Sequence, residues 1–459
     1  MPRRAVIIGG GIGGMAAALL LADRGFAVRI LEAGPRPGAG WRSAATEAGP
    51  ADLGIRVPRE SGNARADALV FHAGVFHAGV FHAGAACAWN RLGAEPSQGH
   101  VACGRLNHDT PCPDARILPP VVLARARAEL LARAFDTDPA GAAPHLAARL
   151  GALFGPTLLD TLLRPACRAL LGAEPEALAW NAAQARLPAR LVVADGEETE
   201  RLRQMGALGA RLAHPRAAEA PRAADAPAYL YPREGGIGRW TTALDAALSA
   251  AGVEVRSGAR VAALRHGARG VVAVRLDGGA ELPADLLVLA AGPNALPFLP
   301  ALPEVTLPAA ARLLTVEGGT APALHWLASY DPATPFLRLG FPDRLEGRRL
   351  PPGAPWRILA ELPIAGGAAP GTRALADALA GLGVLPRGAR IAADRPVGAG
   401  RFAVETVELA AAREAALAEL RGIPNLAVLR SATGGHALVG DLVADAARLA
   451  EAAAPAMAA

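Results

Sequence analysis

A glycine-rich stretch near the N-terminus, AVIIGGGIGGMAAALLLADRGFAVRILE, decides more about the fold of this 459-residue chain than any other feature. Residues 5–8 form a short apolar run that predicts a buried strand, and G-x-G-x-x-G follows at Gly9, Gly11 and Gly14, where a helix must begin. The first glycine permits a sharp turn, the second lets a diphosphate approach the backbone, and the third lets helix and strand pack closely. The helix N-terminus favours phosphate groups. The stretch predicts a dinucleotide-binding βαβ unit.

A second strand and an acidic residue complete this pattern. Residues 27–31 are mostly apolar, and Glu32 follows them, where its carboxylate can accept both ribose hydroxyls and would repel a 2′-phosphate. The run from Ala5 to Ala22 is uncharged and resembles a signal peptide or a membrane span. Because it clusters five glycines and ends in an aspartate rather than a cleavage site, we predict no integral membrane segment.

The composition excludes several classes of function. All 47 basic residues are arginine, so no mechanism can use a lysine Schiff base or a lysine-held water. The net charge of +5 is modest and the arginines are dispersed, which argues against nucleic-acid binding. The four cysteines are scattered without a C-x-x-C pair, so we expect no disulfide framework, no metal site and a reducing cytoplasm.

The residues after the first acid, EAGPRPGAGWRS, resemble a flavoprotein superfamily that includes monoamine oxidases, protoporphyrinogen oxidases, phytoene desaturases and UDP-galactopyranose mutases. The resemblance implies FAD, and we expect non-covalent binding because no Cys or His stands in a recognised attachment motif. The family's paired glycines are here Gly-Ala-Gly. The cofactor-binding residues implied in this region are Gly9, Gly11, Gly13, Gly14, Glu32, Ala33, Arg36, Gly40, Trp41 and Arg42.

A block in the middle of the chain carries the same resemblance. Residues 229–265 resemble the family's Pro-x-x-Gly-Gly loop, helix, and strand that rejoins the cofactor domain. Residues 239–251 have helical spacing and Gly252 is a suitable C-cap. By resemblance, Val261 holds the adenine through its backbone, and a buried strand ending in Ala-Ala-Gly-Pro places Gly292 beneath the dinucleotide.

The last block, residues 423–453, resembles the family's final motif of strand, glycine-bearing turn, acid and helix. Asp441 matches the acid that binds the ribityl-phosphate region of the flavin. A helix from about Leu442 would direct its N-terminus at the flavin pyrimidine ring, where reduction gathers negative charge. The family's Gly-Asn pair is here Arg430-Ser431. The residues implied in this block are Gly435, Asp441, Leu442 and Val443.

These separated blocks predict the domain organisation. The expected fold class is α/β, with a Rossmann-like FAD-binding domain built from separated segments and an α+β substrate domain that has a mixed sheet and a helical lid. The FAD-binding domain is expected to comprise residues 1–66, 226–304 and 395–459. The substrate domain is expected to comprise residues 67–225 and 305–394.

The intervening segments show helical and then strand patterns. Residues 119–135 begin with two prolines and continue with apolar residues at helical spacing. Residues 154–178 predict two short helices broken at Pro165 or Gly172, and they resemble the family's helical lid over the flavin. Residues 305–394 alternate well enough for strands of a sheet, which in relatives faces the flavin.

The stretch PFLRLGF resembles a family segment in which an arginine faces the substrate cavity, and it nominates Arg338 as a catalytic residue. A solvated arginine on a sheet explains the residue equally well. His325, Trp326 and Tyr330 are nearby candidates that packing explains better, and Glu361 is a weaker candidate still.

The sequence VFHAG occurs three times in succession, from Val70 to Gly84, and supplies His72, His77 and His82. A period of five matches neither a helix nor a strand, so no regular element places all three histidines on one metal. We interpret the repeat as one Phe-His-Ala-Gly unit at the cavity rim, expanded in tandem. His72 is then the histidine expected to contact substrate, and a loop without function or a metal site are the alternatives.

The function expected from the resemblance is that of an FAD-dependent oxidoreductase. Such an enzyme removes hydride from a C–N or C–C bond of a small biosynthetic intermediate and passes electrons to oxygen or another acceptor. The absence of lysine makes a desaturase-like or protoporphyrinogen-oxidase-like enzyme more probable than an ordinary amine oxidase. The alternative is a flavin-dependent sugar-nucleotide mutase without net redox change. Whether the chain forms a homodimer stays open.

Overall fold

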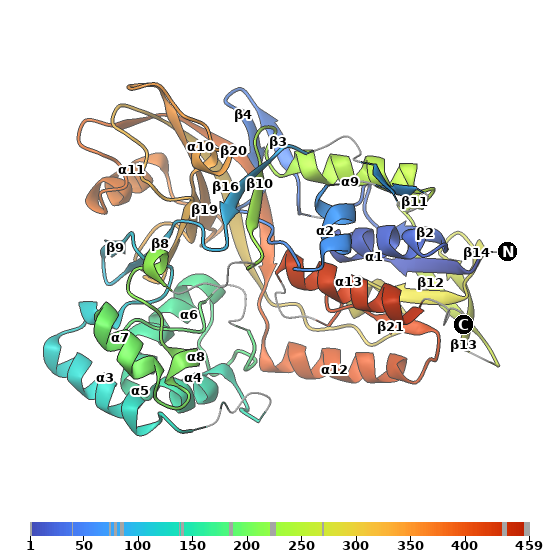
Figure 1. Cartoon of the computed structure of the whole chain (residues 1–459), viewed down its shortest axis with the longest axis horizontal. Helices are drawn as coiled ribbons and strands as arrows, with labels where there is room; N and C mark the ends of the chain where they lie inside the picture. The colour runs from blue at the N-terminus through green and yellow to red at the C-terminus, as the bar shows by residue number, and fades with distance from the viewer. Residues whose placement is uncertain are drawn as a thin grey trace.

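The computed structural model describes all of the chain except residues 1, 39, 73–74, 78–79, 83–86, 137, 139–141, 183–186, 221–225, 269, 434–437 and 454–459, together with the side chains of 75–77 and 80–82. Three parts are visible in Figure 1: a parallel sheet with its helices on the right, a large mixed sheet at the upper left, and a group of helices at the lower left.

The sheet on the right is five-stranded and entirely parallel. Two of its inner strands, Arg4–Ile8 and Leu286–Leu289, are short and almost fully buried because both faces are covered there, which is why they are rich in Val, Ile and Leu. The order is β11 (Glu254–Ser257), β2 (Ala27–Glu32), β1 (Arg4–Ile8), β15 (Leu286–Leu289) and β21 (Leu426–Val428). These strands come from the start, middle and end of the chain, as the separated blocks predicted.

Alternate strand residues enter two different cores. Ala5 and Ile7 of β1 pack with the helices α1 (Ile12–Asp23), α2 (Ala64–Phe71), α9 (Gly238–Ala250) and α13 (Val439–Ala453). Val6 and Ile8 face the opposite core, which contains α12 (Val407–Arg421) and the antiparallel strands β12 (Val261–Gly267), β13 (Gly270–Leu276) and β14 (Glu281–Pro283). The helix predicted over 239–251 is therefore present, displaced by one residue.

The mixed sheet has seven strands, of which only β17 and β8 pair in parallel among the neighbours that the structure describes. The order is β20 (Arg390–Ala403), β16 (Thr306–Glu317), β19 (Trp356–Pro363), β18 (Arg338–Gly340), β17 (Trp326–Ser329), β8 (Gln98–Ala102) and β9 (Arg105–Asn107). The helices α10 (Pro342–Leu345) and α11 (Thr372–Gly381) accompany it. The proposed domain boundary at 394/395 falls inside β20, which pairs with β16 on both sides of that point.

The helical part packs around its own apolar core. It contains α3 (Pro120–Ala132), α4 (Leu146–Phe154), α5 (Pro156–Leu158), a π-helical turn (Leu159–Leu163), α6 (Arg164–Leu171), α7 (Gly196–Arg203) and α8 (Leu208–Arg211). Of the two predicted alternatives for the break, Pro165 is not the one: this residue directly follows the π-helical turn, and the chain stays helical from Pro156 to Leu171. Gly172 ends α6 with φ +71°.

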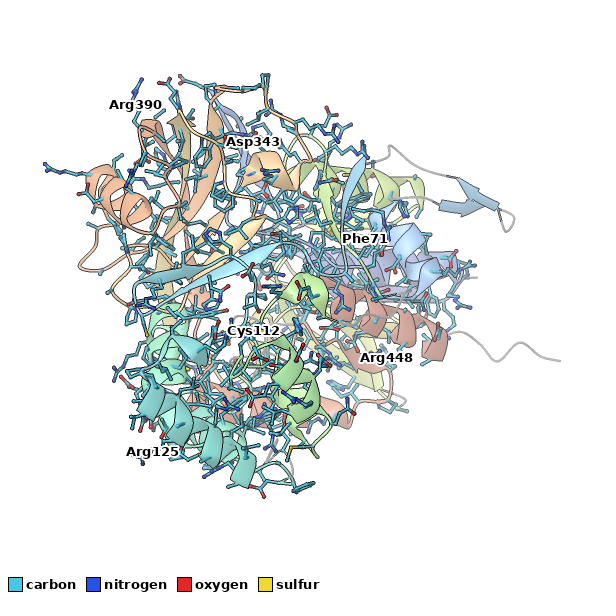
Figure 2. All side chains as sticks on the ribbon, turned by 60° about the vertical axis from the view of Figure 1, so that its left-hand side comes forward. Phe71, Cys112, Arg125, Asp343, Arg390 and Arg448 are labelled. Carbon is cyan, nitrogen blue, oxygen red and sulfur yellow. The ribbon has the colours of Figure 1, made fainter. Side chains whose placement is uncertain are left out.

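Three small antiparallel pairs complete the described structure, apart from short 3₁₀ turns at Ala115–Ile117, Ala217–Glu219 and Pro293–Ala295. They are β3 (Ser43–Thr46) with β4 (Gly49–Asp52), β7 (Trp89–Gly93) with β10 (Tyr229–Pro232), and β5 (Val75–His77) with β6 (Val80–His82). Both strands of the last pair lie in the VFHAG repeat. Among the described strands they pair only with each other, and they extend from the body of the molecule at the right of Figure 2.

Candidate functional site

The glycine triplet has the geometry that its pattern predicted. Gly9 adopts φ +105°, which side chains rarely allow, and a Cβ there would lie 2.7 Å from the Cβ of Ala291. A Cβ at Gly14 would collide with the carbonyl oxygen of Gly9. A Cβ at Gly11 would meet nothing within 4 Å. The first and third glycines therefore serve the turn and the helix packing, and the second leaves open space at the N-terminus of α1.

Glu32 ends β2 beside this turn. Its carboxylate accepts the backbone N–H groups of Gly10 at 2.8 Å and Gly34 at 2.6 Å. The side chain lines a cavity of about 170 Å³ together with Gly9, Ala33 and Val261. Three separated stretches of sequence thus meet at one cavity, with the carboxylate at its wall. Arg260, Asp277 and Asn294 also line this cavity and had not been predicted.

The end of the chain reaches the same turn from the other side. A Cβ at Gly13 would lie 3.0 Å from the Oγ of Ser431, and the Ser431 hydroxyl donates to the carbonyl of Ala290 at 2.8 Å. Leu442 lies beside Gly13, with 3.9 Å between its Cβ and the Cβ built at that glycine. The helix α13 therefore begins next to α1.

The remaining residues nominated in this last block differ in their surroundings. Asp441 is exposed in the first turn of α13, and its carboxylate accepts the N–H of Leu438 at 3.2 Å. The side chain of Val443 is fully buried in the core, so only its backbone is available to a ligand. Gly435 lies outside the described residues. Gly292 precedes the 3₁₀ turn at Pro293–Ala295, whose Asn294 and Ala295 line the cavity that contains Glu32.

Arg36 and Arg42 line a different cavity. This second cavity, of about 380 Å³, lies at the N-terminal half of α9 and includes Arg239 and Asp245. The guanidinium of Arg42 donates to the carbonyl oxygens of Arg36 at 2.5 Å and Pro37 at 2.9 Å. Its position is therefore fixed by the loop that carries both residues.

Trp41 packs against aromatic side chains. Its ring contacts that of Trp240 edge-on, with 5.8 Å between centroids, and the Arg56 guanidinium lies 6.0 Å from its centroid. Gly40 lies beside the same guanidinium: a Cβ there would be in ordinary contact with Nη2 of Arg56, at 3.6 Å. Trp41 and Gly40 thus shape the surroundings of an arginine that sequence reasoning had not singled out.

Arg338, predicted to face the substrate cavity, is held by a carboxylate. Its guanidinium donates from Nε at 2.6 Å and from Nη2 at 2.7 Å to Glu361, its cross-strand partner on β19. Glu361 is buried and also accepts the N–H of Ile55 at 2.7 Å. Gly54 has φ +139° and a Cβ there would lie 2.6 Å from Oε1 of Glu361. The pair therefore fixes the segment that follows β4.

Arg56 lies on that segment and is the functional candidate that sequence reasoning missed. It is half-buried, and it forms no hydrogen bond or ion pair with any residue that the structure describes. Burial lowers the pKa of its guanidinium, and the charge of Glu361 opposes that shift. A desolvated guanidinium without a carboxylate partner favours an anion as its ligand. The signal in the sequence was a charged residue between Ile55 and Val57 just after DLG.

Asp52, four residues earlier, accepts three hydrogen bonds. The donors are the Ser43 hydroxyl at 2.6 Å, the Tyr231 hydroxyl at 2.7 Å and the Ile237 N–H at 2.9 Å. Burial raises the pKa of Asp52 to about 6, against the opposing effect of these hydrogen bonds. The same burial, with the Asp52 charge, raises the pKa of Tyr231 well above its ordinary value.

The other nominated side chains have packing partners. Tyr330 is buried, stacks on His100 and donates its hydroxyl to the carbonyl of Pro111. Nδ1 of His325 accepts the N–H of Ser97 at 2.9 Å. His72 is the exposed C-cap of α2.

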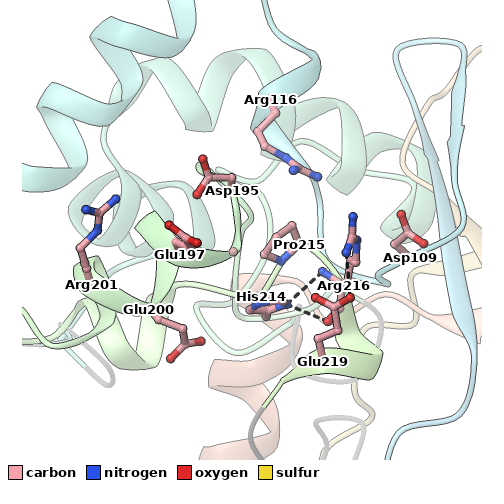
Figure 3. Close-up of a pocket in the computed structure, with 11 residues that line it drawn as sticks. Asp109, Arg116, Asp195, Glu197, Glu200, Arg201, His214, Pro215, Arg216 and Glu219 are labelled. Atoms are coloured by element: carbon pink, nitrogen blue, oxygen red, sulfur yellow. Dashed lines mark hydrogen bonds and ion pairs between the residues drawn. The ribbon is translucent and has the colours of Figure 1, made fainter.

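A cavity of about 940 Å³ lies in the helical part and has a mostly charged lining (Figure 3). His214 lies in it, with Nδ1 at 2.8 Å from the carbonyl oxygen of Arg216. Within the described part of the chain, no three His, Cys, Asp or Glu side chains are arranged to hold a metal ion. No described helix is both long and apolar enough to span a membrane.

Comparisons with known proteins agree with this architecture. The model of the NAD(P)-binding Rossmann-like domain matches residues 7–70. No curated protein matches the sequence. Among solved structures, a reduced UDP-galactopyranose mutase aligns over 98% of this chain and 93% of its own, with a TM-score of 0.61 and 14% identity.

Two further structures align over nearly their whole length. A putative protoporphyrinogen oxidase from Exiguobacterium sp. 255-15 covers 98% of both chains with a TM-score of 0.59 and 16% identity. Cyclohexylamine oxidase from Brevibacterium oxydans IH-35A covers 98% of this chain and 99% of its own, with a TM-score of 0.56 and 16% identity. The predicted fold class is confirmed, and the resemblance to this superfamily is confirmed at the level of the fold.

Proposed function

We propose, for a chain that has the fold of these oxidase and mutase structures, that it is an FAD-dependent oxidoreductase acting on a small biosynthetic intermediate. The observation that carries the proposal is the meeting of Gly9, Glu32 and Val261 at one cavity, next to an open helix N-terminus. Bound FAD would accept hydride from a C–N or C–C bond of the substrate and pass electrons to oxygen or another acceptor.

The residues proposed to hold the cofactor divide by their chemistry. The Glu32 carboxylate would accept the ribose hydroxyls, and the N–H groups at the start of α1 would bind the diphosphate. Val261 would bind the adenine through its backbone. The N-terminus of α13, with Asp441 and Leu442, would lie at the flavin end, where its dipole favours the negative charge of the reduced ring. Binding is proposed to be non-covalent.

Arg56 is proposed to anchor an anionic group of the substrate. Glu361 neutralises Arg338, whereas Arg56 has no carboxylate within ion-pair distance in the described part of the chain. A substrate carboxylate would supply the missing counter-charge and accept two parallel N–H donors of the guanidinium. The fixed position of the guanidinium would then orient the oxidised bond.

A sugar-nucleotide mutase is the second candidate, favoured by the structural likeness to UDP-galactopyranose mutase and by two arginines near one another. Because the Arg338 guanidinium is already paired with Glu361, only Arg56 is available to bind a diphosphate. We therefore favour the oxidoreductase. The scattered cysteines support a cytoplasmic location.

The proposal is tested by anaerobic mixing of the purified protein with a panel of small amines, amino acids and unsaturated or saturated carboxylates, with the flavin absorbance as readout. We expect at least one carboxylate-bearing compound to bleach the flavin, and oxygen or an artificial acceptor to restore it. An Arg56→Ala variant should need a much higher concentration of that compound to bleach the flavin, whereas an Arg59→Ala variant, altered three residues further along, should not. Turnover that needs prior reduction by dithionite and consumes no acceptor would instead support the mutase.

A further inference from the structure

We propose that Asp52 is a positioning residue that fixes the place of the Arg56 guanidinium. The inference rests on the proposed role of Arg56 as an anchor for an anionic group, and it assigns Asp52 no contact with substrate or cofactor. Asp52 would act through the backbone of the segment between the two residues.

The first support is the number of separate segments that converge on one buried carboxylate. Its donors belong to β3 (Ser43), β10 (Tyr231) and the turn before α9 (Ile237). The N–H of Gly238 also donates to the Ser43 hydroxyl at 2.9 Å, which closes the network. Three donors directed at one carboxylate hold β4 against the Gly235-Gly236 turn, and a buried network of this kind is rigid when every member is satisfied.

The second support is the close approach that glycine permits at Gly236. This residue has φ +64°, and a Cβ there would lie 2.6 Å from Oδ1 of Asp52 and 2.5 Å from the hydroxyl oxygen of Ser43. The turn and the carboxylate therefore fit together only without a side chain at this position.

The third support is that the segment from Asp52 to Arg56 is held at both ends. Asp52 ties its start to the turn before α9, and Glu361 ties Ile55 to the mixed sheet. Since Arg56 has no hydrogen-bond partner of its own among the described residues, these backbone ties and the Trp41 ring fix the guanidinium. Loosening one tie would let the charge shift relative to a bound substrate.

Protonation of Asp52 should weaken its connection to the turn before α9 without a mutation. The pKa of about 6 places the change inside an accessible pH range. Protonation of Oδ2 turns this acceptor into a donor, so the hydrogen bond that the Tyr231 hydroxyl donates to it must reverse direction. The other charged groups that act on Asp52, its donor Tyr231 or Arg56 are Glu346, Arg357, Glu361 and Arg338.

A purely electrostatic role of Asp52 and a positioning role predict opposite changes in anion binding when Asp52 is neutralised. The Asp52 charge favours the protonated, cationic form of Arg56, yet it repels an incoming anion. If Asp52 acted only through its charge, its neutralisation would tighten anion binding. If it acts by positioning, its neutralisation weakens anion binding.

The experiment uses the flavin-loaded protein and benzoate as the anionic probe, with the shift of the flavin absorbance giving the Kd between pH 5 and 8. At pH 8 we expect Asp52→Asn to weaken benzoate binding by about tenfold, the scale of a misplaced binding group. In the wild type, benzoate binding should weaken as the pH falls, and the change in Kd should have its midpoint near pH 6. In Asp52→Asn, the Kd should show no such midpoint.

Two further variants keep the test decisive. Tyr231→Phe removes one donor but keeps the carboxylate, so it should weaken binding by a smaller factor and move the midpoint above 6. It also serves if Asp52→Asn does not fold. Asp67→Asn is the matched control: this carboxylate is also buried with a raised pKa, but it binds Ser61 and Gly62, so binding and midpoint should stay as in the wild type.

Binding of benzoate that is unchanged or tighter in Asp52→Asn and Tyr231→Phe overturns the positioning role. Protein that binds no flavin, or an Arg56→Ala variant that binds benzoate as the wild type does, contradicts the proposed function instead and removes the premise. The two failures are therefore separable.

Discussion

Arg338 and Glu361 face each other across β18 and β19 and form a two-point ion pair, with Nε and Nη2 of the arginine at 2.6 and 2.7 Å from the two carboxylate oxygens. Because Glu361 also accepts the N–H of Ile55, this pair joins the mixed sheet to the segment that carries Arg56. The arginine predicted to meet substrate is thus part of the support of another arginine.

Removing the charge of this buried carboxylate should destabilise the fold. Glu361→Gln leaves the Arg338 guanidinium without its counter-charge, and we expect a loss of about 3 kcal/mol in the free energy of unfolding. Urea unfolding followed by circular dichroism measures it. Glu317→Gln, which breaks the exposed pair with Arg390, is the control and should cost less than about 1 kcal/mol. Equal losses in the two variants would refute a structural role for the buried pair.

Glu32 should decide cofactor affinity rather than folding. Glu32→Gln keeps the shape of the side chain but replaces one acceptor oxygen by a donor and removes the charge, so we expect FAD binding to weaken by about 10- to 100-fold, the value of a charged hydrogen bond. Titration of flavin-free protein by fluorescence quenching gives the Kd. Glu254→Gln, at the adjacent strand β11, is the control, since its carboxylate pairs with Arg29 and Arg256. A Kd that rises equally in both variants would count against the assigned role.

The free energy of unfolding should depend on pH through the titration of Asp52. Its folded-state pKa of about 6 lies above the ordinary value of 3.8, so the neutral form favours the folded state. This contribution is fully present below 3.8 and is lost as the pH rises through 6. Lowering the pH from 7.5 to 4.5 should therefore stabilise the wild type relative to Asp52→Asn by about 2 kcal/mol. Parallel unfolding curves for the two proteins across that range would show that Asp52 does not titrate there.

One VFHAG unit should be dispensable. The repeat leaves the core at Phe71, whose ring stacks on Trp240 with 5.4 Å between centroids, and the chain returns at Trp89, whose indole N–H donates to the Phe71 carbonyl at 2.7 Å. Since both ends are fixed, deleting residues 75–79 shortens a connection at a cost well below 1 kcal/mol. Thermal unfolding and flavin content check this expectation.

The control for that deletion lies in the anchor itself. Phe71→Ala empties a fully buried site and should cost about 3 to 5 kcal/mol. A deletion as damaging as Phe71→Ala would show that the repeat has a structural or functional role of its own.

Much of the fold follows from short-range sequence signals. The unit β1–α1–β2 is encoded by consecutive residues, and the glycines at 9, 11 and 14 each have a local steric reason. The helix α9 was predictable because its apolar spacing and its glycine terminator are adjacent in sequence. The sequence allowed a helix break at Pro165 or at Gly172; Gly172 ends the helix, whereas Pro165 does not, because it directly follows a π-helical turn rather than lying in a regular helix interior.

The candidate substrate side depends on contacts that no local pattern records. The sequence around Arg338 is the same whether the side chain faces solvent, substrate or a carboxylate. Only the register between β18 and β19 shows that Glu361 lies opposite it. Arg56 is a candidate because it forms no ion pair with a carboxylate of the described residues. Asp52 is a candidate because it accepts a hydrogen bond from Tyr231, which lies 179 residues away in the sequence. Such features require the assembled structure.

The proposed function depends most on the binding of one FAD by three separated stretches of the chain. The most direct measurement is the visible absorption spectrum of the purified protein, followed by denaturation and quantification of the released flavin. We predict two bands, in the blue and the near ultraviolet, one FAD per chain released on denaturation, and loss of that flavin in Glu32→Gln under dialysis. A colourless, folded protein that binds no added FAD would contradict the account.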